Sequence, residues 1–281
     1  PTISNLNLSN FPSSGGASIM VTGSNIHYPE PSCNSATAAH DVFIGPTSQT
    51  SKTYFSSTAF GLITAAGSGA SRTLTVAVGG QSASFNVGYD APSITSIVPK
   101  NGPTNGATTI ILHGNNFGVA SGVASVKIGS TSCSPIVSIT HTTLKCTLQP
   151  GFGSGIFPQV TIDGSSVTAD VSDAGFNYDA PVINSVEAAA ASNGRPTAGG
   201  VSITITGRNF GTSSTNTVVS LASKSLSTSK SCSSVRVSGT TNITCILPVG
   251  VGANDLKVDV PGGGAANSLL GSSLFNYDAP T

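Results

Sequence analysis

Histidine is the side chain best suited to acid–base chemistry near neutral pH. The chain has four histidines, His27, His40, His113 and His141, and they are scattered without the spacing of a catalytic or zinc-binding motif. The sequence also lacks a Gly-x-Ser-x-Gly nucleophile elbow, a His-Glu-x-x-His motif and a Gly-Lys-Thr/Ser phosphate-binding loop. We therefore expect a protein that is not an enzyme and that holds no cofactor.

Cysteine is the other reactive residue type, and its spacing is regular. Cys133 and Cys146 are 13 residues apart, and so are Cys232 and Cys245, whereas Cys33 is left over. Each pair can be a disulfide or two buried thiols, because buried cysteine behaves as a small apolar residue. Zinc is disfavoured, since no histidine accompanies either pair at ligand spacing.

The composition limits the partners. Charged residues make up 8% of the chain, and 11 basic and 11 acidic side chains give a net charge of zero. No basic field can attract nucleic acid or an anionic membrane. No stretch approaches the roughly 20 apolar residues that cross a bilayer, so we expect no membrane insertion by this segment and place any export signal outside it. Short alternating runs of β-branched residues indicate a soluble protein of short strands.

An internal repeat organises the whole chain. Tyr-Asp-Ala-Pro occurs at 89–92, 178–181 and 277–280, and Pro1-Thr2 matches the closing Pro280-Thr281. A short opening strand follows each proline, marked by Ile3 with Leu6, Ile94 with Ile97, and Ile183 with Val186. A Gly-rich turn and an alternating segment come next, at 17–25, 108–116 and 201–209. Because it begins and ends at equivalent points of the repeat, the chain resembles a segment of a longer array.

The alternating segments predict strands with one buried face. Side chains two residues apart share a face, which places in the core Ile19 with Val21, Ile110 with Leu112, and Ile203 with Ile205. The closing strands alternate aromatics in the same way, with Phe176 and Tyr178, Phe275 and Tyr277, and in the first unit Phe85, Val87 and Tyr89. The recurring Gly-x-Asn, at Asn25, Asn116 and Asn209, is interpreted as the turn that ends the second strand.

Units of about 90 residues with several short strands and no helical period are typical of an antiparallel immunoglobulin-like sandwich. We predict an all-β chain of three sandwiches, over residues 1–91, 92–180 and 181–281. At each junction the closing strand runs through Asp-Ala-Pro into the next strand without a Gly/Ser spacer. Such short joints favour a stiff, extended rod, which would reach on the order of 100 Å.

The second and third units resemble the IPT/TIG immunoglobulin-like domain of plexins, Rel-type transcription factors and microbial surface arrays. The similarity is carried by PSITSIVPKNGPTNGATTIILHGNNFG at 92–118, by the following segment with Cys133 and Cys146, and by PTAGGVSITITGRNFG with Cys232 and Cys245. The first unit keeps SSGGASIMVTGSN and VFIG but lacks the paired cysteines. The resemblance implies the fold but no single function.

The resemblance also implies that the two cysteine pairs form disulfides within domains 2 and 3. Disulfides would place the chain in an extracellular or cell-surface compartment. Two candidate N-glycosylation sites agree with this location, Asn7 in Asn-Leu-Ser and Asn242 in Asn-Ile-Thr. Cys33 would then pair with a neighbouring chain or domain, or remain a free thiol.

Asp90, Asp179 and Asp278 lie at the junctions, where other sandwich arrays bind calcium. Calcium takes about six to eight oxygen ligands. Each junction offers one recurring aspartate with few acidic neighbours, so we expect no metal and favour an aspartate that accepts a backbone or turn hydrogen bond.

Our first functional hypothesis is a structural or adhesion protein that forms a stalk, filament or surface coat by contacts with other copies, neighbouring extracellular proteins or glycans. The alternative is a carbohydrate-binding accessory module, which needs exposed aromatic platforms. The chain has no tryptophan, so Tyr28 and Tyr54 are the candidates. A DNA-binding domain would need clustered cations, of which Lys224, Lys230 and Arg236 form the one loose group.

Overall fold

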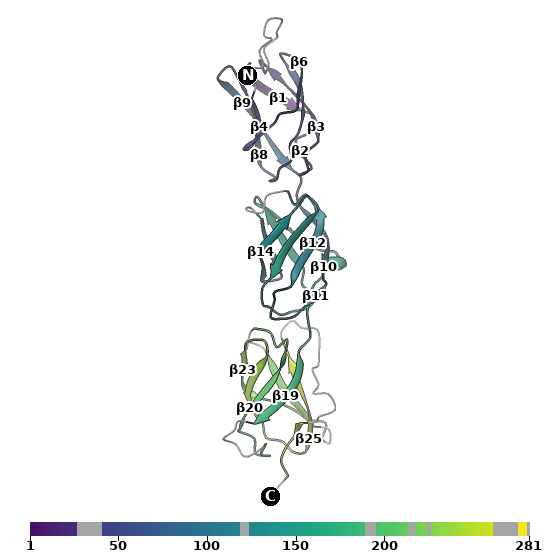
Figure 1. Cartoon of the computed structure of the whole chain (residues 1–281), viewed down its shortest axis with the longest axis vertical. Coiled ribbons are helices and arrows are strands. Elements are labelled where there is room, and N and C mark those ends of the chain that lie inside the picture. The colour runs from purple at the N-terminus through teal and green to yellow at the C-terminus, as the bar shows by residue number, and fades with distance from the viewer. Residues whose placement is uncertain are drawn as a thin grey trace.

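The computed structural model describes residues 1–26, 41–118, 124–188, 195–212, 217–223, 226–260 and 275–279. Three β-sandwiches follow one another along the long axis of the molecule, with the first and third at opposite ends (Figure 1). The described secondary structure is β throughout, apart from one short 3₁₀ turn, η2 (Ser172–Ala174). The predicted all-β fold is confirmed.

Domain 1 is a sandwich of a four-stranded and a five-stranded sheet. The first sheet has the order β1-β3-β7-β6 and the second the order β2-β9-β8-β4-β5. The strands are β1 (Thr2–Leu6), β2 (Asn10–Phe11), β3 (Ser18–Ser24), β4 (Asp41–Ile44), β5 (Thr47–Ser48), β6 (Lys52–Ser56), β7 (Ala59–Ile63), β8 (Arg72–Val78) and β9 (Gln81–Tyr89).

Domain 2 differs because its long strand β14 joins the two layers. β14 pairs with β15 in one layer and with β13 in the other, which gives one continuous sheet, β10-β12-β15-β14-β13-β16-β17, beside the short pair β11-β18. The strands are β10 (Ser93–Val98), β11 (Asn101–Gly102), β12 (Thr109–Asn115), β13 (Ala124–Ile128), β14 (Thr131–Ile139), β15 (Thr143–Leu148), β16 (Pro158–Ile162), β17 (Ser165–Thr168) and β18 (Asn177–Tyr178).

Domain 3 again has two separate sheets, β19-β20-β24-β23 and β22-β21-β25-β26. The strand that is continuous in domain 2 is divided here at Cys232, so that β22 and β23 belong to opposite layers. The strands are β19 (Val182–Ala188), β20 (Ser202–Arg208), β21 (Val218–Ser223), β22 (Ser229–Ser231), β23 (Ser233–Ser238), β24 (Asn242–Ile246), β25 (Ala253–Asp259) and β26 (Phe275–Asn276).

Each domain has its own hydrophobic core, and the three cores share no residue. The alternating strands β3, β12 and β20 contribute the pairs predicted from the sequence, all at most 1% exposed: Ile19 with Val21, Ile110 with Leu112, and Ile203 with Ile205. The closing aromatics Phe176, Tyr178, Phe275 and Tyr277 are buried as predicted.

The closing strand of domain 1 departs from the prediction. Tyr89 is 3% exposed, but Phe85 is only partly buried and packs at the edge of the core. Phe11 from β2 is fully buried instead, and its ring lies edge-on to that of Tyr89 with the centroids 5.9 Å apart. Phe11, which is far from Tyr89 in the sequence, therefore occupies the core position that Phe176 and Phe275 occupy in the other two domains.

Candidate functional site

The Gly-x-Asn repeat forms a turn with the same geometry in all three domains. Asn25, Asn116 and Asn209 have φ of 52°, 60° and 61°, a left-handed conformation that asparagine tolerates better than most residues. The glycine two positions earlier lies close to the opening strand, because a Cβ added to Gly114 would be 1.9 Å from the carbonyl oxygen of Ser93. The interpretation of this repeat as a turn is confirmed.

The side chains of Asn116 and Asn209 also join successive domains. At the first interface, between domains 1 and 2, Asn116 Oδ1 accepts a hydrogen bond from the Ser13 N–H (3.1 Å), and Nδ2 donates to the carbonyl of Ala91 (3.3 Å). Asn209 makes the same two contacts at the second interface, with the Thr104 N–H (3.3 Å) and the carbonyl of Ala180 (3.1 Å). One amide therefore bonds both the preceding domain and the junction that enters its own domain.

The sequence contained a signal for this contact that pattern reasoning missed. Ser13, Thr104 and Thr197 each follow a proline and precede a glycine by two positions, so the partner of the asparagine also recurs. The two partners lie 103 and 105 residues apart in the chain, and nothing local connects them. Ser13 and Thr104 are 0% and 2% exposed, which marks them as interface residues rather than surface turns.

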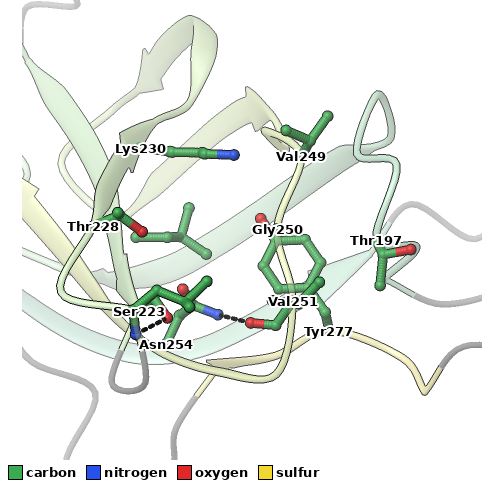
Figure 2. A pocket seen from close by; sticks show the side chains of 11 residues that line it. Thr197, Ser223, Thr228, Lys230, Val249, Gly250, Val251, Asn254 and Tyr277 are labelled. Carbon is green, nitrogen blue, oxygen red and sulfur yellow. Dashed lines mark hydrogen bonds between the residues drawn. The ribbon is translucent and has the colours of Figure 1, made fainter.

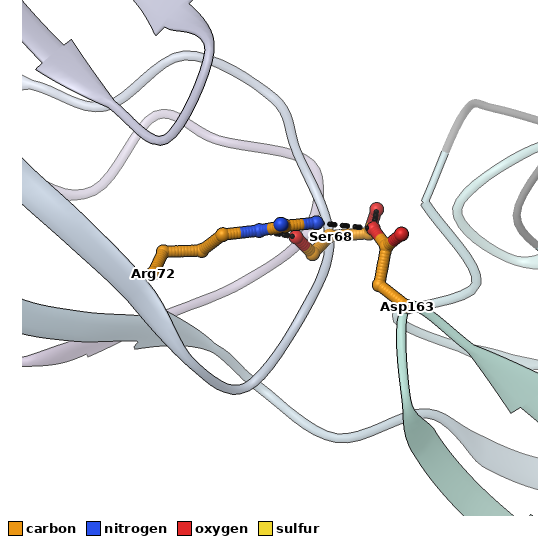
Figure 3. Close-up of polar contacts among 3 residues, drawn as sticks. All are labelled: Ser68, Arg72 and Asp163. Carbon is orange, nitrogen blue, oxygen red and sulfur yellow. Dashed lines mark hydrogen bonds and ion pairs between the residues drawn. The ribbon is translucent and has the colours of Figure 1, made fainter.

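The first interface carries an additional ion pair. Arg72 Nη2 of domain 1 lies 2.6 Å from Asp163 Oδ2 of domain 2, and the two side chains are only 29% and 13% exposed. Ser68 donates its hydroxyl to the same carboxylate oxygen, and Arg72 Nε donates to the Ser68 carbonyl (2.7 Å), as Figure 3 shows. These charges are largely shielded from water. Removing one partner should therefore cost more stability than it would in an exposed ion pair.

His141 is also part of the first interface. Its Nδ1 lies 3.1 Å from Ser13 Oγ. Of the other histidines, His113 is exposed on β12, and His27 and His40 lie outside the described residues. Of the two histidines that the structure describes, His141 therefore serves an interdomain hydrogen bond.

The second interface is more apolar. Thr104 Oγ1 accepts a hydrogen bond from the Gly211 N–H at 3.4 Å. Phe152 of domain 2 lies against Gly211, where an added Cβ would be 3.4 Å from Phe152 Cβ. At the first interface, a Cβ added to Gly118 would be 3.0 Å from Ser68 Cβ of domain 1. The glycine after Asn-Phe therefore leaves room for the loop of the preceding domain.

The tyrosine of each Tyr-Asp-Ala-Pro fixes a loop of its own domain, which in domains 1 and 2 faces the next domain. The Tyr89, Tyr178 and Tyr277 hydroxyls donate to the carbonyls of Ala65, Gln149 and Pro248, at 3.0, 3.0 and 2.7 Å. Burial raises the pKa of all three tyrosines, and it raises that of Tyr277 to about 12. The interface loop is therefore held from within its own domain.

The junction aspartates make local hydrogen bonds. Asp179 Oδ1 accepts from Asn101 Nδ2 (2.7 Å), and Asp278 Oδ2 accepts from the Arg195 N–H (2.6 Å). The backbone N–H groups of Asp90 and Asp179 donate to the carbonyls of Phe11 and Gly102, both at 2.7 Å. Within the described ranges no three His, Cys, Asp or Glu side chains gather as a metal site would require.

The two cysteine pairs differ in the structure. Cys133 and Cys146 form a disulfide in domain 2, with their Cα atoms 5.4 Å apart. In domain 3 Cys232 and Cys245 are buried thiols, which departs from the expected second disulfide. Cys133 lies within the continuous strand β14, whereas Cys232 lies between β22 and β23, where the chain changes sheets. The two thiols nevertheless remain in hydrogen-bonding contact.

The remaining predicted surface residues are scattered. Asn7 is exposed and accepts a hydrogen bond from the Met20 N–H through its Oδ1 (2.7 Å), and Asn242 is half-buried at the start of β24. Tyr54 is half-buried against Phe60, with ring centroids 5.7 Å apart, so it presents little free ring surface. Cys33, Tyr28 and Lys224 lie outside the described residues.

A pocket of about 300 Å³ lies at the end of domain 3 away from domain 2. Figure 2 shows Thr197, Val249, Val251 and Tyr277 around it, together with Lys230 and Asn254. Asn254 Nδ2 donates to the carbonyls of Val251 and Gly252, both at 3.0 Å. Thr197 follows a proline as Ser13 and Thr104 do, so the pocket is lined by the loop of domain 3 that corresponds to the interface loops of domains 1 and 2.

A family model for the IPT/TIG domain matches residues 1–90, 92–178 and 181–277. The chain belongs to the IPT/TIG family. The left-handed turn and the tyrosine hydrogen bond thus recur in all three IPT/TIG domains, and the asparagine bridge, the pair of hydrogen bonds that Asn116 or Asn209 makes across a junction, recurs in domains 2 and 3. The described part of the chain has no helix that is long and apolar enough to span a membrane.

Solved structures with similar folds come from several proteins. The plexin A4 extracellular region is 16% identical, with a TM-score of 0.33 over 98% of this chain. The adhesin FdeC of Escherichia coli is 15% identical (TM-score 0.29), covering 99% of this chain and 96% of that one. SGBP-B from a xyloglucan utilization locus in Bacteroides uniformis is 15% identical (TM-score 0.26), covering 89% and 86%. This chain spans 24% and 34% of the two plexin A4 structures, and all these similarities concern the fold alone.

Proposed function

We propose that this chain is a non-catalytic extracellular structural or adhesion protein whose three IPT/TIG domains form a stiff rod, as in a stalk, filament or surface coat. The observation that carries the proposal is the repeated asparagine bridge. Asn116 and Asn209 each bond two backbone groups across a junction that has no flexible spacer. A chain of independent binding modules would have no need for identical polar contacts at successive junctions.

Two further observations support an extracellular location and extracellular partners. The Cys133–Cys146 disulfide is typical of an oxidising compartment. The low charge and abundant Ser and Thr give a neutral polar surface, suited to contacts with other copies, neighbouring extracellular proteins or glycans.

The location is tested on protein from its natural source. Peptide mapping without reduction, combined with labelling of intact cells by an antibody to the chain, should show a linked Cys133–Cys146 peptide and surface staining. Sugar masses on Asn7 or Asn242 would add support, since both carry the acceptor pattern. Reduced Cys133 and Cys146 in protein confined to the cell interior would contradict the extracellular proposal.

A specific observation favours glycan binding as a second candidate. Phe55 on β6, at one edge of its sheet, is 60% exposed. Exposed aromatic rings stack on the apolar faces of sugars, and Phe55 is more available for this than Tyr54. Titration calorimetry with soluble oligosaccharides should detect binding that Phe55→Ala abolishes and that Leu8→Ala, at another exposed apolar residue of domain 1, leaves unchanged. Equal binding by both variants would contradict this candidate.

A further inference from the structure

The two interfaces differ in what lies beside the loop that the upstream tyrosine fixes. At the first interface the Arg72 guanidinium lies over Gly69, where an added Cβ would meet Arg72 Nε, Cζ and Nη2 at 2.7 to 2.8 Å. Burial raises the pKa of Tyr89, and the charge of Arg72 opposes this rise, so the cation also lies near the tyrosine. On its other side the guanidinium contacts Asp163 of domain 2 (Figure 3). The chain therefore supplies a bound cation to its own first interface.

Domain 2 repeats this loop, and a cavity lies at the corresponding place. Gly153 corresponds to Gly69, because both have a positive φ, of 121° and 100°. In addition, the carbonyl of each glycine accepts a hydrogen bond from the N–H of its domain's tyrosine, at 2.8 Å in domain 2 and 2.9 Å in domain 1. A cavity of about 210 Å³ at the second interface is lined by Gly153 and Tyr178. The place of the Arg72 guanidinium at the first interface is therefore a cavity at the second.

The residue that supplies the cation in domain 1 is replaced in domain 2. Gly45 and Gly129 form equivalent turns after β4 and β13. A Cβ added to the first would meet Arg72 Cδ at 3.3 Å, and one added to the second would meet Ile156 Cβ at 3.4 Å. Ile156 thus has the position of Arg72, but it packs against the core of domain 2 and carries no charge. The cation that this position supplies to the first interface has no equivalent from Ile156 at the second.

The cavity at the second interface is suited to a cation. Asp179 is the one charged residue among the described residues that line it. This aspartate is half-buried; its Oδ1 accepts a hydrogen bond from Asn101 Nδ2 (2.7 Å), and its Oδ2 has no donor in the described part of the chain. Phe152 of domain 2 and Val260 of domain 3 line the same cavity. A carboxylate and an aromatic ring together suit a guanidinium, which stacks on the ring and donates N–H groups to the carboxylate.

We propose that the cavity between domains 2 and 3 binds an arginine side chain of a neighbouring extracellular protein. The incoming guanidinium donates to Asp179 and stacks on Phe152, and so takes the place that Arg72 has at the first interface. The volume of about 210 Å³ suits one side chain, since pockets for larger ligands start near 300 Å³. A partner bound here contacts both domains and braces the second interface. The inference rests on the proposed function for the class of partner.

The test titrates the full chain with Nα-acetylarginine N-methylamide and follows the backbone amides by NMR. We expect the Phe152 and Gly153 signals to shift along a saturable curve with a Kd on the order of 1 mM, since a single side chain makes few contacts. The citrulline analogue has nearly the same shape without the charge, and it should bind at least about tenfold more weakly. Equal binding of the two probes, or no saturable shift at Phe152 and Gly153, would overturn the inference.

Two matched variants identify the carboxylate responsible. Asp179→Asn removes the charge but keeps an oxygen for Asn101, so it should fold normally and bind the arginine probe at least about tenfold more weakly. Asp90→Asn, at the exposed counterpart in the first junction, should leave binding unchanged. Undiminished binding by Asp179→Asn would overturn the inference. The proposed function fails separately: reduced Cys133 in protein confined to the cell interior would count against an extracellular partner, whereas the probe titration would still decide whether the cavity binds arginine.

Discussion

The glycine and the asparagine of the repeated Gly-x-Asn turn have different roles. Gly114 permits the close approach of strand β10, and Asn116 takes the left-handed conformation and bonds domain 1. The glycine thus contributes to the stability of its own domain, while the asparagine contributes to the coupling between domains. The two can be separated by substitution.

We predict that Gly114→Ala destabilises domain 2 by about 2 kcal/mol or more, because the new methyl group would overlap the Ser93 carbonyl and force the strands apart. The control is Gly175→Ala, where φ is −70° and the nearest atom to an added Cβ is at 3.4 Å. Urea unfolding should show the loss for Gly114→Ala and little change for Gly175→Ala. Similar midpoints for both variants would contradict this role of Gly114.

Tyr277 makes the stability of domain 3 depend on pH in the alkaline range. Burial, with a smaller effect from nearby Cys232, raises its pKa from the ordinary 10.0 to about 12. Between these values the unfolded state loses the tyrosine proton first, so the stability should fall as the pH rises from about 10 to about 12. Tyr277→Phe should remove this part of the pH dependence and cost about 1 kcal/mol below pH 10 through the lost bond to Pro248. Thermal unfolding measured across that pH range checks whether stability falls as the pH rises. The same slope of stability against pH in Tyr277→Phe would refute the prediction.

The thiols of domain 3 provide a further prediction. The hydrogen bond with Cys232, together with burial, raises the pKa of Cys245 well above its ordinary value. We expect the native protein to react with iodoacetamide at Cys245 far more slowly than the unfolded protein at pH 8, because the thiolate is the reactive form. Mild oxidation should link the two sulfur atoms within one chain, since they already touch. Peptide mapping measures the alkylation of Cys245 and the formation of the Cys232–Cys245 disulfide. Rapid alkylation of Cys245 in the native protein would contradict the buried geometry.

At the scale of elements, the sequence predicted the strands but not their irregularities. Ile3 and Leu6 are three apart, which in a regular strand puts them on opposite faces. The register of β1 shifts between Ile3 and Asn5, and β10 and β19 shift at the equivalent places, so both apolar residues of each opening strand turn toward the core. The bulge depends on pairing with the second strand, which a local pattern does not reveal. The division of one strand into β22 and β23 could not be predicted either, because it also depends on which strands pair.

The first interface can be tested through its ion pair. We predict a coupling energy of about 1 kcal/mol between Arg72 and Asp163 in a double-mutant cycle with Arg72→Met and Asp163→Asn, because the pair is largely shielded. Lys100 and Asp173 form a matched pair in domain 2 at 2.8 Å, with side chains 56% and 73% exposed. The same cycle there should give a value near zero. Equal coupling in the two cycles, measured by chemical unfolding, would show that the interface does not strengthen the Arg72–Asp163 pair.

At the scale of the whole molecule, the repeat of Tyr-Asp-Ala-Pro was enough to predict three sandwiches, because identical phrases at a fixed period require identical units. It could not show how the units contact one another. The contacts depend on Ser13 and Thr104, whose type is common in this Ser/Thr-rich chain and whose role follows only from burial. The direct passage from one closing strand to the next opening strand limited the spacing of the domains but left their relative orientation open.

Small-angle X-ray scattering of the full chain tests the central claim, that Asn116 and Asn209 hold the three domains as a stiff rod. We predict a single extended form with a maximum dimension on the order of 100 Å. The double variant Asn116→Ala/Asn209→Ala should give a shorter, broader distance distribution, and Asn115→Ala, at the exposed neighbour, should match the unchanged chain. A flexible or folded-back unchanged chain, or a double variant with the same scattering as the unchanged chain, would contradict the account.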